Sequence, residues 1–109
     1  MLDPKLLELG FTANALTPQQ KAALDKRGFT ILENLIDPDW LAQLRQAFEN
    51  VTAAEGIDAG KEVNQVGGVR RLSDLVNKGD VFDGVYLQPT LLTAVAHVLK
   101  QPFKLHSLN

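Results

Sequence analysis

The sequence predicts an α+β fold that is mainly helical. Two stretches carry matched start and stop signals for helices, and a third, between two prolines, has leucines and valines at helical spacing. Short runs of β-branched and apolar residues separate these stretches and predict strands. At 109 residues, with 45% hydrophobic and 22% charged residues, the chain has the size and composition of one globular domain or a piece of one.

The chain begins with an apolar stretch, residues 1–16, that lacks a strong cap, and we interpret it as an N-terminal arm. A clear helix follows in "TPQQKAALDKR". Thr17 is its N-cap and Pro18 its first helical residue, while Gln20 completes a capping box. Gly28 then provides a left-handed C-terminal cap. These signals fix both ends of the helix without reference to the rest of the chain.

A short strand is predicted next at residues 29–36, "FTILENLI", followed by a second capped helix. Asp37 caps this helix, Pro38 opens it and Gly56 stops it. Its apolar residues recur at steps of three and four, so one stripe should face a core. That stripe consists of Leu41, Leu44, Phe48 and Val51.

The second half of the chain is less regular. Residues 56–68 contain four glycines and predict a long loop, of the kind that is usually functional or mobile. Residues 69–72 could form a short strand, and helical turns are expected between 79 and 87. A helix should run from Pro89 to the residue before Pro102, with one apolar face made of Leu91, Leu92, Val95, Val98 and Leu99. The alternation in "FKLHSLN", residues 103–109, predicts a terminal strand.

Composition excludes several function classes. The net charge is −2, and the 11 basic and 13 acidic residues are interspersed, which gives no footprint for nucleic acid or anionic lipid. The chain has no cysteine, so disulfides, thiol nucleophiles and cysteine-ligated zinc are absent. No apolar run approaches the roughly 20 residues of a membrane span, and the first residues do not resemble a signal peptide. We expect a cytoplasmic protein with no nucleic-acid or membrane partner.

The two histidines are the candidates for a metal site. His97 falls on the side of its helix away from the apolar stripe, together with Thr93 and Lys100, so we expect a solvated surface histidine. His106 lies within the terminal strand, either as a hydrogen-bonded pocket residue or as a ligand. Neither belongs to a known zinc-binding spacing. The sequence therefore predicts no complete metal site in these 109 residues.

Other catalytic motifs are also missing. Ser73 and Ser107 lack the G-x-S-x-G elbow of a serine nucleophile, and Gly67 and Gly68 form neither a dinucleotide fingerprint nor a P-loop. Trp40 is expected to anchor the core. No catalytic residue is assigned.

Arg70 and Arg71 are the most informative charges, because they follow the glycine-rich loop. Neighbouring residues in a strand face opposite ways, so one guanidinium can point inward while the other is solvated. An inward arginine needs a carboxylate or a similar anion. This anion could be internal, from Asp74 or Glu62, or it could belong to a ligand carboxylate or phosphate.

The order of these elements resembles the N-terminal half of the phytanoyl-CoA dioxygenase family. The resemblance covers residues 17–109. Its most specific parts are the "LTPQQ" helix opening with "GFTILENLIDP", and the "PTLLTAVAHVL" helix that leads into a segment ending "SLN". Each part alone occurs in many unrelated proteins, and the resemblance rests on the order and spacing of the parts.

The resemblance implies an oxygenase that depends on iron(II) and 2-oxoglutarate and is built on a double-stranded β-helix, a cupin-like jelly roll. Such enzymes hold iron through an H-x-D motif and a distant histidine. None of these ligands is present here. We therefore expect residues 17–109 to be the N-terminal segment of a single oxygenase domain, truncated before its H-x-D. This segment would be a mainly helical lobe beside the barrel.

By itself, this segment should be inactive and should bind neither cofactor tightly. The full-length enzyme would hydroxylate a small organic substrate and release succinate and CO2. Matched to the family, "RLSDL" makes Arg71 a ligand of a 2-oxoglutarate carboxylate. The terminal strand places His106 and Leu108 on one face of the cosubstrate pocket, with Lys104 as a weaker candidate. The 56–68 loop would be part of a lid.

Two alternatives remain open at this point. The chain could be a small non-catalytic helical interaction or scaffold module that shares the same pattern of helix caps. It could also be a family member that has lost its metal.

Overall fold

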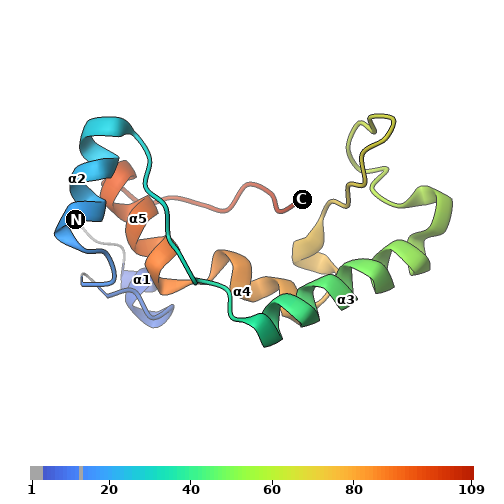
Figure 1. Ribbon diagram of the computed structural model, residues 1–109, viewed down its shortest axis with the longest axis horizontal. Helices are drawn as coiled ribbons and strands as arrows, with labels where there is room; N and C mark the ends of the chain where they lie inside the picture. Colours follow the sequence, from blue (N-terminus) through green and yellow to red (C-terminus); the bar gives the residue numbers. More distant parts are fainter. Residues whose placement is uncertain (1–3, 13) are drawn as a thin grey trace. The chain divides into compact units, whose positions relative to one another are not determined.

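The computed structural model describes residues 4–12 and 14–109, and the described part is helical (Figure 1). It divides into two compact units. Unit 1 comprises the described part of Met1–Leu35 together with Val85–Leu105, and unit 2 comprises Ile36–Gly84 together with His106–Asn109. The elements in chain order are α1 (Pro4–Glu8), α2 (Pro18–Arg27), α3 (Pro38–Glu55), η1 (Gly56–Asp58), η2 (Leu75–Asn77), η3 (Asp80–Phe82), α4 (Asp83–Tyr86) and α5 (Pro89–Leu99).

Helix α2 of unit 1 begins and ends where its caps predict. The backbone N–H of Gln20 donates to Thr17 Oγ1 (3.1 Å), and the Gln20 side chain accepts from the Thr17 N–H (2.9 Å). Gly28 adopts a left-handed conformation with φ +79° and donates to the Leu24 carbonyl (3.1 Å). The capping box and the glycine stop are both confirmed.

Helices α2 and α5 pack side by side in unit 1 (Figure 1). The buried side chains of α5 are Leu92 and Thr93. Thr93 is 3% exposed, and its hydroxyl donates to the Thr12 carbonyl (3.0 Å). Val98 and Leu99 are exposed instead. The predicted apolar face of this helix is thus wrong in part, because a threonine hydroxyl that finds a carbonyl can be buried as readily as an apolar group.

Part of the N-terminal arm packs into unit 1. Leu6 of α1 and Leu16, just before the α2 cap, are both buried. Two apolar anchors therefore tie this stretch to the rest of the unit.

Unit 2 is built around α3. Asp37 Oδ1 accepts from the Trp40 N–H (2.8 Å), which confirms the predicted N-cap, and Gly56 ends the helix. The Trp40 indole donates to the Val81 carbonyl (3.3 Å), and a Cβ at Gly84 would lie 2.8 Å from the ring. Trp40 thus packs against η3 and α4, but it is only half-buried and lies outside the buried core of unit 2, so the prediction that it anchors the core is not confirmed.

The core of unit 2 lies between α3 and the segments that follow the glycine-rich loop. Its buried members are Leu72, Leu75 and Phe82. Partly buried side chains of α3 and its neighbours pack against them: Leu44, Ala47, Phe48, Val51, Ala59, Val81 and Leu108. Three of the four residues in the predicted α3 stripe are thus in this core.

The three predicted strands are wrong. Residues 29–36, 69–72 and 103–109 form no strand in the structure, so the described part is not α+β. A strand requires a second extended segment to complete its ladder of hydrogen bonds, and the alternating pattern cannot supply one. Residues 106–109 belong to unit 2, where the Leu75 N–H donates to the Leu108 carbonyl (3.1 Å). The predicted helical turns at 79–87 are confirmed as η3 and α4.

No helix within the described ranges combines the length and apolar character that crossing a membrane requires.

Candidate functional site

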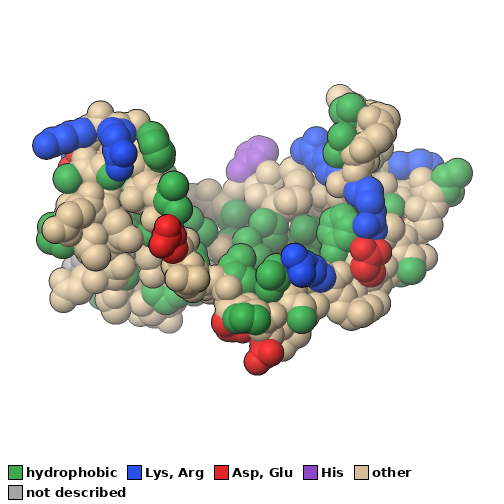
Figure 2. All heavy atoms as spheres, viewed as in Figure 1, with side chains coloured by type: hydrophobic (Ala, Val, Ile, Leu, Met, Phe, Trp, Pro, Cys, Tyr) green, Lys and Arg blue, Asp and Glu red, His purple; other side chains and the backbone are tan. Residues whose placement is uncertain are grey.

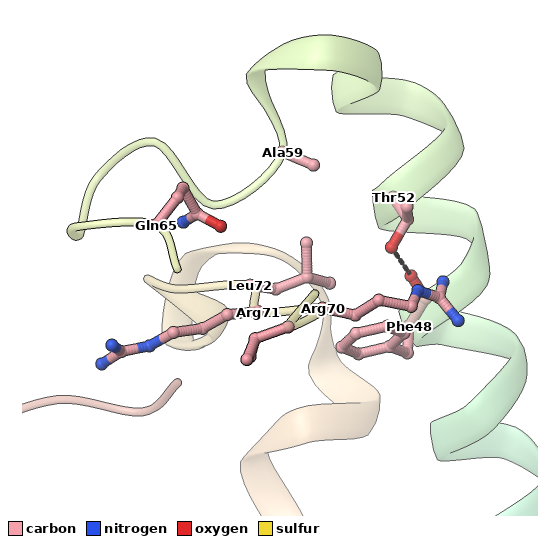
Figure 3. Close-up of a pocket in the computed structure, with 8 residues that line it drawn as sticks. Phe48, Thr52, Ala59, Gln65, Arg70, Arg71 and Leu72 are labelled. Atoms are coloured by element: carbon pink, nitrogen blue, oxygen red, sulfur yellow. Dashed lines mark hydrogen bonds between the residues drawn. The ribbon is translucent and has the colours of Figure 1, made fainter. Parts of the chain in front are cut away.

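Unit 2 contains a pocket of about 170 Å³ beside α3 (Figure 3). Helix α3, the glycine-rich segment 56–68 and the stretch 69–72 form its walls. The residues that line it are Phe48, Thr52, Ala59, Gln65, Val69, Arg70, Arg71 and Leu72. The pocket therefore combines apolar walls with the two arginines that the sequence singles out.

Segment 56–68 forms one wall because it folds back on the stretch that follows it. Gly60 has φ +75°, and a Cβ there would overlap the Arg71 carbonyl oxygen. The Gln65 side chain donates to the Gly60 carbonyl and to the Val63 carbonyl (3.3 Å). Only glycine combines this left-handed conformation with so close an approach of two backbones. The long loop that the sequence predicts is therefore anchored at its centre.

Arg70 is directed toward α3. Its guanidinium forms a two-pronged ion pair with Glu49, with N···O distances of 3.0 and 2.8 Å, and lies 5.0 Å from the centre of the Phe48 ring. The hydrogen bond with the carboxylate raises the pKa of Arg70 above its usual value, and the hydrogen bond from Arg70 lowers the pKa of Glu49. The charge of Arg70 is thus already matched within the fold.

Arg71 extends in the opposite direction, away from Phe48 (Figure 3). Its side chain is exposed and has no carboxylate partner among residues 4–12 and 14–109. With the Asn109 amide turned so that its oxygen faces the guanidinium, that oxygen lies 3.2 Å from Nη2. Arg71 therefore holds a positive charge that the described residues do not neutralise.

The predicted internal salt bridge of this arginine pair to Asp74 or Glu62 is wrong. Asp74 accepts from the Asn77 amide (2.9 Å), and Glu62 pairs with Lys78 (2.6 Å). The two arginines extend in opposite directions although they do not lie in a strand. Both side chains are exposed, so the prediction that one of them points inward is wrong.

The other two predicted pocket residues lie in the C-terminal segment of unit 2. His106 is exposed, with Nδ1 3.2 Å from Ser107 Oγ. Leu108 is half-buried against the core formed around Leu72 and Phe82. The structure thus brings Arg71 close to this segment through Asn109, while His106 and Leu108 differ in exposure. Lys104, the weaker candidate, is exposed and belongs to unit 1.

Sequence reasoning missed a polar cluster next to the pocket. Lys78 Nζ lies 2.9 Å from Glu55 Oε1 and 2.6 Å from Glu62 Oε1, and Ser73 Oγ donates to Glu62 Oε2 (3.0 Å). Hydrogen bonds from Lys78, from its own backbone and from Ser73 lower the pKa of Glu62 to about 2. Burial opposes the charge of Lys78, yet the hydrogen bonds to Glu62 and Glu55 raise its pKa. These four residues span 24 positions, so no local pattern could indicate their contact.

His97 is not the solvated histidine that the sequence predicts. Its side chain is 22% exposed, and Nε2 lies 2.8 Å from Asp25 Oδ1, which joins α5 to α2. The prediction is wrong because α2 covers the side of α5 that the apolar pattern assigns to solvent. Within the described ranges, no group of three or more histidine, cysteine, aspartate or glutamate side chains could hold a metal ion.

Comparison with known families shows which family this chain belongs to. The family model described as Phytanoyl-CoA dioxygenase (PhyH) matches residues 24–108, most of the chain. The chain belongs to the phytanoyl-CoA dioxygenase family. No curated protein and no solved structure matches it. The resemblance found in the sequence is thereby confirmed.

The phytanoyl-CoA dioxygenase family is a family of iron(II) and 2-oxoglutarate oxygenases with a cupin-like fold, and the described part of this member is a helical lobe. Iron in such enzymes needs two histidines and a carboxylate around one point. The described residues offer no such group, so iron does not fit them. A guanidinium is the kind of group that binds a carboxylate, and Arg71 is exposed without a carboxylate partner among the described residues.

Proposed function

We propose that this chain is the N-terminal part of an oxygenase that depends on iron(II) and 2-oxoglutarate and hydroxylates a small organic substrate. The family match over residues 24–108 carries this proposal. Iron and 2-oxoglutarate together supply the oxygen-activating chemistry in this family, and succinate and CO2 would be the co-products. What residues 1–109 would supply is part of the cosubstrate site.

Arg71 is the residue that we assign to 2-oxoglutarate. A guanidinium recognises a carboxylate through two parallel hydrogen bonds, and the neutral amide of Asn109 does not satisfy its charge. Arg70 cannot take this role, because Glu49 already occupies its two-pronged face. His106 and Leu108 would flank the bound molecule from the C-terminal segment.

The iron ligands would come from polypeptide outside these 109 residues, since the described residues supply no three-ligand group. Residues 17–109 would then be one segment of a single oxygenase domain, inactive without the iron ligands. The gene sequence downstream of the Asn109 codon tests this directly. An H-x-D motif there supports the proposal, and its absence from the reading frame contradicts it and favours a non-catalytic scaffold.

The assignment of Arg71 is tested by titrating the isotope-labelled chain with 2-oxoglutarate and recording amide NMR shifts. We expect weak binding, with shifts concentrated at residues 71 and 106–109. Arg71→Gln should remove these shifts, whereas Arg45→Gln, a matched change at an exposed position of α3, should not. Inorganic phosphate provides the competing anion, and equal shifts with phosphate would contradict selection of a dicarboxylate. Shifts that persist in Arg71→Gln would overturn the assignment.

A further inference from the structure

The Lys78 side chain is largely buried. Its side chain is only 16% exposed, and two carboxylates surround its ammonium group, those of Glu55 on α3 and Glu62 on segment 56–68. A buried charge destabilises the folded state unless it is paired and hydrogen-bonded. Lys78 therefore holds Glu62 in place while it is itself held by α3.

Glu62 has a second attachment. Its Oε2 accepts a hydrogen bond from Ser73 Oγ (3.0 Å), and Ser73 is 1% exposed. Ser73 directly follows Leu72, which lines the pocket. The Glu62 side chain thus binds two residues, Ser73 and Lys78, that follow the pocket-lining stretch 69–72 in the sequence. We call Glu62, Lys78 and Ser73 the latch.

The latch lies within the stretch that forms a pocket wall. Ala59 and Gln65 line the pocket, and Glu62 is between them in sequence. Gly60 is pressed against the Arg71 backbone, and Gln65 bonds back to Gly60. The latch and the Gly60 contact therefore fix the same short stretch at two neighbouring points.

We propose that Glu62 is a positioning residue, which holds residues 59–65 as a wall of the pocket through Lys78 and Ser73 and so shapes the site of the ligand that Arg71 binds. The identity of that ligand, 2-oxoglutarate, rests on the proposed function. The latch itself rests only on the contacts within unit 2. Release of Glu62 opens this wall without moving α3.

Glu62→Gln is the variant that isolates the latch. In this variant Lys78 keeps its ion pair with Glu55, so its buried ammonium group still has a carboxylate partner. Substitution of Lys78 is less informative. Glu55 already has one buried oxygen, Oε2, without a hydrogen-bond partner, and it would also lose its ion pair, so the variant would destabilise α3 as well as Glu62. Asp58→Asn is the matched control. It removes one carboxylate from the same segment, but from an ion pair with Lys61 in which both side chains are about two-thirds exposed.

Amide hydrogen exchange in the 109-residue chain tests the latch. The Lys61 N–H donates to Asp58 O (3.1 Å) and the Val63 N–H to Gly60 O (3.2 Å), so both report opening of the wall. After correction for intrinsic rates, Glu62→Gln should exchange about two- to fivefold faster than wild type at these amides. Asp58→Asn should not, and the Gly28 amide of unit 1 should keep its rate in both variants. Wild-type rates in Glu62→Gln would overturn the latch.

Titration with 2-oxoglutarate separates the latch from the proposed function. If wild type binds, Glu62→Gln should bind severalfold more weakly, and Asp58→Asn should bind as wild type does. Unchanged affinity in Glu62→Gln would refute the positioning role. If wild type does not bind while exchange accelerates in Glu62→Gln, the latch stands and the assignment of Arg71 fails.

Discussion

Glu62 Oε1 and Lys78 Nζ lie 2.6 Å apart, an ion pair between residues 16 positions apart that joins the glycine-rich segment to the turn after η2. The pair lies next to the only stretch of the described chain where two backbones approach so closely that glycine is required, at Gly60 and Arg71. Figure 2 shows lysine, arginine, aspartate and glutamate side chains at the surface of the described residues. The stability of the pocket wall should therefore depend on a few identifiable contacts.

Stability should fall in acid because of Glu62. The pKa of its carboxyl is about 2 in the fold against an ordinary value of 4.5, so the unfolded chain binds more protons between these pH values. The contribution of this group is fully present above about pH 4.5 and is lost as the pH falls toward 2. The Glu62 side-chain carboxyl, followed by NMR, should titrate near pH 2.

Glu62→Gln supplies the comparison for this titration. Urea unfolding of wild type between pH 6 and about 2.5 should show a steeper loss of stability than the variant shows. A Glu62 carboxyl that titrates near its ordinary pKa in the folded chain would contradict the ion pair described here.

Three glycines of the 56–68 segment should differ in their response to alanine. Gly67 lacks a positive φ and has open space around its Cβ position, so Gly67→Ala should be neutral or slightly stabilising. Gly68 has φ +79° with open space, and Gly68→Ala should cost about 1 kcal/mol. Gly60 combines φ +75° with the Arg71 carbonyl, and Gly60→Ala should cost at least about 3 kcal/mol.

Chemical unfolding of the three glycine variants measures this order. Equal effects at Gly60 and Gly68 would mean that the backbone contact with Arg71 is not made in solution.

The capping box of α2 should contribute measurably to unit 1. Thr17→Ala removes the oxygen that accepts from the Gln20 N–H and should destabilise the chain by about 1 kcal/mol. Gln19→Ala is the control, since Gln19 is exposed in the first turn of the same helix. Circular dichroism during thermal unfolding should show a lower midpoint for the first variant alone, and a similar midpoint in both would argue against the cap.

Thr93 should matter for its hydroxyl more than for its shape. Thr93→Val keeps the side-chain volume but removes the donor to the carbonyls of Thr12 (3.0 Å) and Pro89 (2.7 Å). We expect a loss of about 1 kcal/mol in the free energy of unfolding. Thr90→Val on the same helix should have a smaller effect, and a reversal of this order in urea unfolding would contradict the burial of Thr93.

Local signals predicted the helices well. Caps such as Thr17 with Gln20, and stops such as Gly28, act within one or two turns, and the structure confirms them. The three predicted strands depend on partners that an alternating pattern cannot specify, and none forms. For the same reason the buried side of α5 was misjudged: α2 lies against His97 and the Thr12 carbonyl meets Thr93, both contacts between residues far apart in sequence.

The family and the positions of α2, α3 and α5 can be predicted from the amino-acid sequence alone, because they follow from caps, spacing and motif order. Which of the two arginines forms an ion pair depends instead on contacts between residues far apart in the sequence. Glu49, 21 residues before Arg70, forms a two-pronged ion pair with it, whereas Arg71 has no carboxylate partner among the described residues. The contacts of Glu62 with Ser73 and Lys78 likewise join residues 11 and 16 positions apart, so they form only when the chain folds.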